Sequence, residues 1–327
     1  MLNIGIVSYA HPHVLKYVPA FLSHPNVEIA KICGIGANIE IAKRDAEKIG
    51  CKFFDTLEEK FFEDLDAIYI ASEPLRHTEI VKMASEYGVH VLCDKPIAVN
   101  MKEADEIIET ARKGGIKFMV PFNTRWQPAL RKAKELIQGD VQYIYAVKFG
   151  MNPINIRNFD TSWFFDREMA GFGGFGDIGM HMLDAIRFLV ESDAIRVYTR
   201  IDKDDYFGNA IIEFKNGALV HLISGWTNPF GKAPWMNATL EVLTDDMAIL
   251  INKPLYEPVS DFCVFKERAE FSDLGRVGIP SNVNEFVNSI LEDRDPIIKG
   301  EDAKASLEIT IAGYISSKKG REVKLPL

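Results

Sequence analysis

Three residues in the middle of this 327-residue sequence have the types and the spacing for acid-base chemistry: Asp177, His181 and Asp184. Apolar residues around them recur at three- and four-residue steps, which predicts a helix from about Gly174 to Leu189. On that helix the three side chains share one face. A carboxylate one turn from a histidine can orient the imidazole and raise its pKa, as a general base near neutral pH requires.

The run from Gly171 to Gly176, just before this helix, contains four glycines in six residues. Glycine permits positive φ and close backbone approach, and we interpret this concentration as the mark of a functional site. Two other interpretations stay open. Asp177 caps the helix and His181 is structural, or Asp177, His181 and Asp184 bind a metal, although no second His or Cys has ligand spacing nearby.

A second candidate catalytic residue is Lys95, in the sequence Cys93-Asp94-Lys95-Pro96. It directly follows an apolar run that reads as a buried strand. The proline keeps the lysine backbone out of helical geometry, which aims the side chain off the end of the strand. An ammonium group there can donate to a substrate hydroxyl or a cofactor ribose. The alternative is an ordinary solvated loop lysine.

The elements that must position Lys95 come from the first 120 residues, which alternate between strand and helix patterns. The expected strands are residues 2–7, 27–33, 51–54, 65–71, 89–93 and 116–120, and the expected helices are 14–22, 39–49, 78–87 and 101–113. Regular alternation with short links predicts a doubly wound parallel (Rossmann) sheet. Such sheets bind ligands beyond the carboxyl ends of their strands.

The loop after the first strand, Ser8 to His13, lacks the G-x-G-x-x-G fingerprint of dinucleotide-binding proteins, with Ser8, Ala10 and His13 in place of the glycines. The helix that follows still offers free N–H groups and a dipole to a phosphate, and His11 and His13 can hydrogen-bond one. Because that dipole disfavours their protonation, we expect both histidines to be largely neutral. His-Pro-His as a simple tight loop is the alternative.

The loop after the second strand begins with Gly34, where an NAD site usually has an acidic residue and an NADP site has a nearby basic one. Gly34 supplies neither, so the sequence does not decide between NAD and NADP. Polar residues follow the other strands. The full set of predicted cofactor contacts is Ser8, Tyr9, Ala10, His11, His13, Gly34, Ser72, Glu73, His77, Asp94, Lys95 and Asn123.

The second half of the chain has a different pattern, with alternating strands and few helices. The expected strands are 141–149, 195–201, 209–214, 219–224, 239–243, 247–251 and 259–265, and the expected helices outside the central one are 128–138, 283–291 and 303–316. Asn216-Gly217 predicts a hairpin between two of these strands. We therefore expect an α/β protein with a dinucleotide-binding domain at 1–121 and an α+β domain at 122–327. The mostly antiparallel sheet of the second domain is expected to form one wall of the substrate cleft and a dimer surface.

Composition excludes several other classes of protein. The net charge of -9 and the absence of basic runs argue against nucleic-acid binding. No apolar run reaches the roughly 18 residues of a membrane span, and the start lacks a signal-peptide pattern. The four cysteines have no CxxC spacing, so we expect reduced thiols in a cytoplasmic protein.

Taken together, the motifs resemble those of the glucose-fructose oxidoreductase, inositol dehydrogenase and rhizopine-catabolism family, Gfo/Idh/MocA. The matching segments are Asp94-Lys95-Pro96 (the family's Glu-Lys-Pro), Asn123-Thr124-Arg125-Trp126, Ala170-Gly171-Phe172-Gly173, Asp177-Ile178-Gly179-Met180-His181 with Asp184, and the tail segments Asp295-Pro296, Gly300-Glu301-Asp302-Ala303 and Gly320-Arg321-Glu322-Val323. The resemblance runs the whole length of the chain.

The resemblance implies an NAD(P)-dependent oxidoreductase acting on a sugar, cyclitol or related polyhydroxylated substrate. It implies that Lys95 contacts substrate and nicotinamide ribose, while Asp177 and His181 handle the hydroxyl proton. Arg157, Asp160 and Trp163 are candidate substrate contacts, and Phe164 makes the pocket more apolar than is usual in the family.

We expect NAD or NADP as cofactor, no metal, and a homodimer or homotetramer. The alternatives are a non-catalytic nucleotide- or sugar-binding regulator and a hydrolase or lyase that uses bound NAD transiently.

Overall fold

The computed structural model describes residues 1–226, 238–252, 261–264, 269–271 and 278–327. They form two compact units. Unit 1 contains residues 1–121, 156–171 and 279–304, and unit 2 contains residues 122–155, 172–278 and 305–327. Both units are therefore built from separate stretches of the chain.

Unit 1 is organised on a six-stranded parallel sheet in the order β3-β2-β1-β4-β5-β6, the strand order of dinucleotide-binding Rossmann folds. Its strands are β1 (Leu2–Val7), β2 (Val27–Cys33), β3 (Lys52–Phe54), β4 (Ala67–Ile70), β5 (His90–Cys93) and β6 (Phe118–Met119). Its helices are α1 (Val14–Leu22), α2 (Ile39–Ile49), α3 (Glu59–Phe62), η1 (Pro74–Arg76), α4 (His77–Glu86), α5 (Met101–Lys113), η4 (Ser162–Phe165), α7 (Arg167–Ala170) and α9 (Ile279–Leu291).

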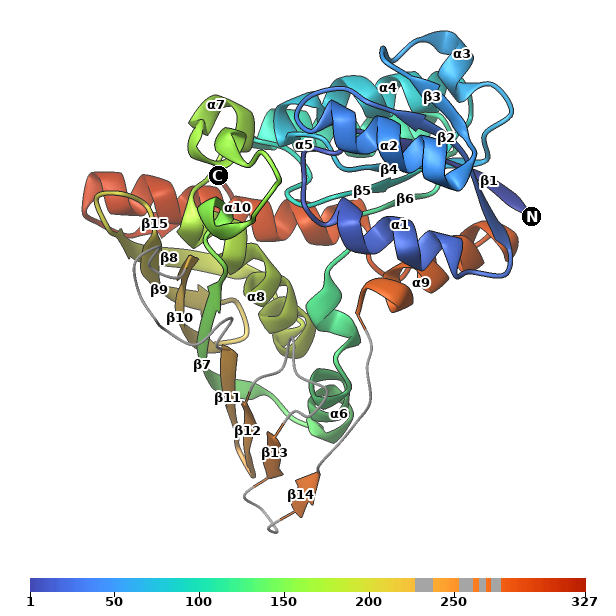
Figure 1. The fold of residues 1–327 in the computed structure, drawn as a ribbon. Coiled ribbons are helices and arrows are strands. Elements are labelled where there is room, and N and C mark those ends of the chain that lie inside the picture. Colours follow the sequence, from blue (N-terminus) through green and yellow to red (C-terminus); the bar gives the residue numbers. More distant parts are fainter. Residues whose placement is uncertain (227–237, 253–260, 265–268, 272–277) are drawn as a thin grey trace. The chain divides into compact units, whose positions relative to one another are not determined.

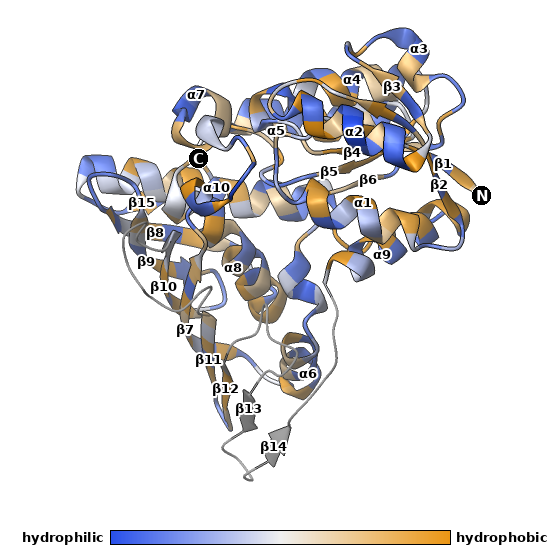
Figure 2. Cartoon of the chain, viewed as in Figure 1, coloured by the Kyte–Doolittle hydropathy of each residue, from blue (hydrophilic) through white to orange (hydrophobic). Residues whose placement is uncertain are grey.

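Burial on both faces explains why the strands of this sheet have continuous apolar sequences. Every residue of β4 is buried, as expected for a parallel strand covered on both faces. Helix α9, although it comes from the end of the chain, packs beside α1 (Figure 1), and the Asn282 side chain donates to the Tyr17 hydroxyl at 3.2 Å. Figure 2 shows strands that are mainly apolar, whereas polar residues colour the exposed sides of α2 and α3.

Unit 2 is organised on a nine-stranded sheet in the order β14-β13-β12-β11-β7-β10-β9-β8-β15, in which only the β7–β10 pair is parallel. Its strands are β7 (Val141–Gly150), β8 (Ala194–Ile201), β9 (Phe207–Phe214), β10 (Leu219–Trp226), β11 (Ala238–Thr244), β12 (Ala248–Asn252), β13 (Asp261–Val264), β14 (Ala269–Phe271) and β15 (Val323–Lys324). Its helices are η2 (Asn123–Trp126), α6 (Pro128–Leu136), η3 (Pro153–Asn155) and α8 (Gly174–Val190), and α10 (Gly300–Lys319) begins in unit 1 and continues into unit 2.

Helix α8 packs against β7 and β10 and is the centre of the unit 2 core. Its apolar side chains, Met182, Leu183 and Ile186 among them, meet inward-facing strand residues such as Val220 and Leu222. Helix α8 is buried along most of its length, so the surrounding packing fixes the positions of its polar residues His181 and Asp184.

The expected fold class is confirmed: a parallel Rossmann sheet and a second, mostly antiparallel sheet. The predicted hairpin at Asn216-Gly217 joins the antiparallel pair β9 and β10. Part of the expected strand 259–265 lies outside the described residues. Within the described chain, none of the helices combines the length and hydropathy that crossing a bilayer requires.

Candidate active site

Asp94 is the centre of a buried polar cluster at the carboxyl end of β5 in unit 1. Its oxygens accept hydrogen bonds from the Tyr69 hydroxyl at 2.6 Å and from the Lys95 backbone N–H at 2.8 Å. Burial would raise the pKa of Asp94, but the charges of His11 and His13 and the hydrogen bonds from His13 and Tyr69 outweigh it and hold the pKa well below its usual range. Asp94 is therefore a carboxylate at neutral pH.

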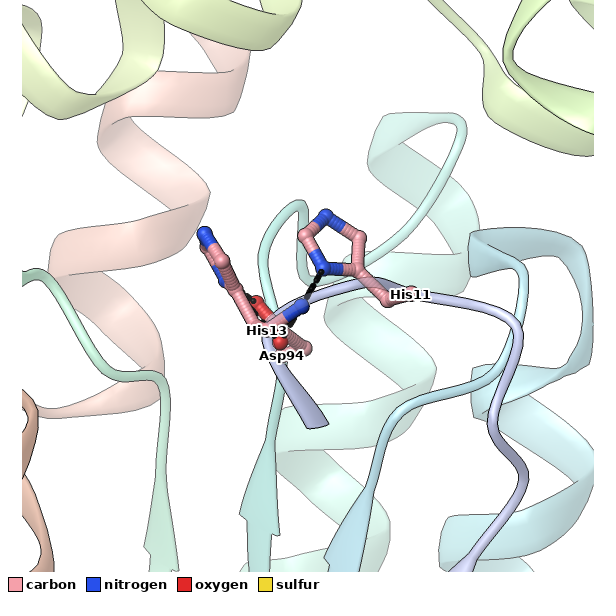
Figure 3. Close-up of side chains that lie close together, drawn as sticks. All are labelled: His11, His13 and Asp94. Carbon is pink, nitrogen blue, oxygen red and sulfur yellow. Dashed lines mark hydrogen bonds and ion pairs between the residues drawn. The ribbon is translucent and has the colours of Figure 1, made fainter. Parts of the chain in front are cut away.

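The imidazoles of His11 and His13 lie beside this carboxylate (Figure 3). The Nδ1 atom of His13 is 3.0 Å from Asp94 Oδ1, and Nδ1 of His11 is 3.5 Å from Asp94 Oδ2. Among the residues that the structure describes, this is the only group of three side chains with spacing suited to a metal ion. Since the carboxylate already accepts from the hydroxyl of Tyr69 and the amide of Lys95, we interpret the cluster as a hydrogen-bond network.

The loop from Ser8 to His13 uses its backbone donors internally. Ser8 has left-handed backbone geometry, with φ of 73°, and its hydroxyl accepts from the Ala10 N–H at 3.1 Å. The N–H of His11 donates to the Ala71 carbonyl at 2.8 Å, and the N–H of His13 donates to Nδ1 of His11 at 3.2 Å. The N–H groups at the start of α1, on Val14, Leu15 and Lys16, likewise donate to carbonyls of this loop, so the free N–H groups expected here are already engaged.

Three other predicted cofactor residues, Tyr9, Ser72 and His77, have buried side chains. The His77 ring lies between the carbonyls of Ile97, at 3.2 Å, and Ser72, at 3.3 Å. Burial lowers the pKa of His77, so the ring is neutral at physiological pH. These side chains shape the loops at the sheet edge. Asn123, also predicted, is half-buried at the start of η2 in unit 2.

Glu73 follows β4 and points its carboxylate at the loop after β2. Its Oε1 accepts from the Ala37 N–H at 3.3 Å, and its Oε2 accepts from Nε of Arg76 at 3.2 Å. Gly34, in that same loop, brings no polar group and is packed against the Phe53 ring. The acidic group missing from the second strand end is therefore supplied by another loop.

The predicted substrate contacts, Arg157, Asp160 and Trp163, belong to the segment 156–171 of unit 1. The Trp163 indole donates to the Ala10 carbonyl at 3.1 Å, and the Asp160 N–H donates to the Asn38 side chain at 2.7 Å. Arg157 is exposed. Trp163 and Asp160 therefore fix this segment on the loops after β1 and β2.

In unit 2, helix α8 carries Asp177 and His181 one turn apart. The half-buried Asp177 accepts a hydrogen bond from the Trp226 indole at 2.7 Å. His181 is buried, and its ring meets the Phe122 ring edge-on with centroids 6.1 Å apart. A fixed carboxylate one turn before a shielded imidazole suits acid-base catalysis.

Asp184 has a structural partner that the sequence pattern did not indicate. Arg125 donates from Nε and Nη2 to the two Asp184 oxygens, at 2.8 and 2.7 Å, and the pair is buried. A two-pronged pair of this kind occupies both oxygens. The open interpretation of Asp184 as a metal ligand with Asp177 and His181 is therefore not supported.

The glycine run before α8 is explained by packing, which corrects the expectation that only a site would demand it. A Cβ on Gly174 would lie 2.1 Å from the Tyr206 carbonyl oxygen. The Tyr314 hydroxyl accepts from the N–H groups of Gly173 and Gly176 and donates to Asp205. The glycines let the first turn of α8 lie directly on neighbouring backbone.

Comparison with known proteins shows the same two-part organisation. Residues 3–122 match the family model described as "Oxidoreductase family, NAD-binding Rossmann fold", and residues 130–249 match the Gfo/Idh/MocA C-terminal domain. The chain belongs to the Gfo/Idh/MocA family. Membership was expected from the motifs and is confirmed.

Among the Gfo/Idh/MocA relatives, levoglucosan dehydrogenase of Pseudarthrobacter phenanthrenivorans is 30% identical over 58% of this chain and 51% of that enzyme. Myo-inositol 2-dehydrogenase of Thermotoga maritima is 24% identical over 85% of this chain and 86% of its own. A solved levoglucosan dehydrogenase, in complex with NADH and levoglucosan, has a TM-score of 0.83 at 21% identity and covers all of both chains. The matched segment spans about half the length of the first two curated relatives.

Proposed function

We propose that the protein is an NAD(P)-dependent oxidoreductase that transfers hydride between a nicotinamide and a CH–OH carbon of a sugar, cyclitol or related polyhydroxylated substrate. Membership of the family supports the proposal, as do the names of the relatives, which act on levoglucosan and myo-inositol. The observation that carries it is the position of Asp177 one turn before the buried His181 on helix α8.

The edge of the unit 1 sheet fits a dinucleotide at two points. The carboxylate of Glu73 lies at the ends of β2 and β4, where the adenosine ribose of a bound dinucleotide is placed in this fold. His11 and His13 are placed at the end of β1, where the pyrophosphate is placed. The nicotinamide, when bound, supplies or accepts the hydride.

The proposed roles of the chain's own residues follow from their chemistry. In the oxidation direction, His181 takes the proton of the substrate hydroxyl, and Asp177 stabilises the resulting imidazolium. Lys95 donates a hydrogen bond to the same oxygen as its charge develops. Reduction reverses each transfer.

The first test is direct binding of NADH and NADPH to purified protein from which carried-over cofactor has been extracted, measured by calorimetry. Micromolar binding of either supports the proposal. A screen of sugars and cyclitols, followed through nicotinamide absorbance, then identifies the substrate. Turnover of substrate without net change in that absorbance would instead indicate a hydrolase or lyase with transient redox chemistry.

A non-catalytic binding protein is the second candidate. It is favoured by the loop after β1, where the N–H groups of Ala10, His11 and His13 already have acceptors inside the protein. Failure to bind NADH, NADPH or their oxidised forms would contradict the dehydrogenase and support a sugar-binding role, tested with the same panel of sugars by calorimetry.

A further inference from the structure

The loop after β2, residues 34–38, has no acidic side chain of its own. Its sequence is Gly34-Ile35-Gly36-Ala37-Asn38. At Gly34 a side chain would have no room, because a Cβ would lie 2.7 Å from the Phe53 ring. A ribose-binding carboxylate at this position must therefore come from elsewhere in unit 1.

The carboxylate of Glu73 fills that place. β1 lies between β2 and β4 in the sheet. Glu73 lies three residues after the end of β4, and its side chain reaches the β2 loop, where it accepts from the Ala37 N–H. A Cβ on Gly36 would lie 2.6 Å from both carboxylate oxygens of Glu73. With φ of 74°, Gly36 holds a conformation that residues with a side chain rarely adopt. Glycine at 36 thus makes the space that this carboxylate occupies.

The charges around this position are predominantly negative. A cleft is lined by Glu73, Leu75, Arg76, Glu79 and Met169, which places two carboxylates against one guanidinium. The Glu73 side chain is 6% exposed and its partner Arg76 is 44% exposed. The guanidinium in this cleft is therefore already paired with the inner carboxylate.

A carboxylate accepts hydrogen bonds and has none to donate. The ribose hydroxyls of NAD are donors that match it, whereas the 2′-phosphate of NADP brings additional negative charge and loses one donor. The Glu73 carboxylate therefore attracts the ribose hydroxyls of NAD and repels the 2′-phosphate of NADP.

We propose that Glu73 selects NAD over NADP by accepting hydrogen bonds from the adenosine ribose hydroxyls. The selection rests on the proposed function, because it assumes that a dinucleotide binds along this sheet edge. It assigns the discriminating residue to the loop after β4, with Gly36 as the residue that admits its carboxylate.

The experiment compares NADH with NADPH, and ADP-ribose with 2′-phospho-ADP-ribose, by calorimetry on the whole protein. We expect the unphosphorylated member of each pair to bind at least about tenfold more tightly, as expected for one hydrogen bond to a charged group. We expect Glu73→Gln to weaken NADH and ADP-ribose and to bring both ratios toward one.

Two further variants make the assignment specific. Gly36→Ala keeps the charge but places a methyl group where the carboxylate lies, and we expect it to lower NADH affinity in the same direction as Glu73→Gln. Glu86→Gln removes an exposed carboxylate from the carboxyl end of α4, the helix that follows the Glu73 loop, and we expect it to leave both ratios unchanged.

The failure of each idea is recognisable. Tighter binding of NADPH by the unaltered protein, or an unchanged ratio in correctly folded Glu73→Gln, overturns the role of Glu73 while leaving the oxidoreductase intact. If Glu73→Gln does not fold, the ratio of NADH to NADPH affinity in the unaltered protein and in Gly36→Ala decides whether Glu73 selects the cofactor. Binding of neither dinucleotide and neither ADP-ribose analogue overturns the proposed function as well.

Discussion

At the scale of single residues, His181 is the sharpest test of the proposed chemistry. We expect His181→Ala to lower turnover by about 100-fold or more, because a general base contributes at least that much, while NADH affinity changes little. The measurement is steady-state kinetics with the substrate found in the screen, together with calorimetry. His24→Ala, in a loop of unit 1, is the matched control and should retain turnover. Unaltered turnover in His181→Ala would remove the residue from the mechanism.

A second prediction at this scale concerns pH and stability at His90. Burial lowers the pKa of His90, the Lys117 charge lowers it further, and Nδ1 accepts the Lys117 backbone N–H at 3.0 Å, which requires the neutral ring. The folded state therefore binds this proton less readily than the unfolded state does. Its contribution to stability is present above the ordinary histidine pKa of about 6.5 and is lost as pH falls below that value.

The measurement is urea unfolding between pH 8 and pH 5. We expect the free energy of unfolding to decline on the acid side, and we expect His90→Asn to show a shallower decline. An identical pH dependence in the variant would show that His90 does not contribute.

At the scale of elements, the buried Arg125–Asp184 pair joins η2 to α8. We expect Arg125→Met to destabilise unit 2 by about 3–5 kcal/mol, because it leaves a buried carboxylate without its partner. In Arg125→Met with Asp184→Leu, most of that loss should be recovered, since neither charge remains. Hydrogen exchange of α8 amides, read by mass spectrometry, localises the effect.

Lys132→Met provides the control for that prediction. It breaks the exposed ion pair with Glu135 in the same unit, and such pairs contribute at most about 1 kcal/mol. If the stability losses of Arg125→Met and Asp184→Leu simply add in the double variant, the coupling assigned to Arg125 and Asp184 is contradicted.

Helices and strands were predictable from sequence where the spacing of apolar residues alone determines them. Helices α1, α2 and α5 begin and end where the apolar spacing and the flanking residues indicate. The partners of site residues were not predictable in the same way. Arg125 meets Asp184 across 59 positions, and Glu73 meets Ala37 across 36, and no local pattern encodes such distances. Asp177 and His181 were found because both lie on one helix.

The glycine run shows how a correct observation can receive the wrong cause. Its backbone freedom was evident in the sequence, but the reason is the approach of Gly174 to the carbonyl of Tyr206, which directly precedes β9, together with the Tyr314 hydroxyl. Trp226 was missed for the same reason, since only the folded sheet brings its indole to Asp177.

At the scale of the whole molecule, the outer face of the nine-stranded sheet carries a row of aromatic and apolar side chains. Cross-strand pairing aligns Tyr198, Ile211, His221 and Tyr145 across β8, β9, β10 and β7. Tyr198 is 36% exposed and Ile211 is 47% exposed. Core residues such as Ala210 and Ile212 point to the opposite face, toward α8. Exposed apolar side chains that gather on one face are typical of protein–protein contact surfaces.

We expect a second copy of the chain to cover this face, in keeping with the predicted homodimer or homotetramer. Ile211→Lys should lower the molecular mass measured by size-exclusion chromatography with light scattering. Leu75→Lys, an equally exposed apolar position at 48% in unit 1, is the control and should not change the mass. A monomeric mass for the unaltered protein would contradict the expectation.

The composition of unit 1 from three separate stretches has a consequence for biosynthesis. A ribosome releases residues 1–121 long before α9, which ends at Leu291, and the side of α1 that carries Tyr17 is without its partner until then. The six strands of the amino-terminal sheet are all synthesised early, but the contact between α1 and α9 (Ile279–Leu291) forms only after most of the second unit has been synthesised. Long-range closure of this kind slows folding, and it exposes an apolar helix face to chaperones in the interval.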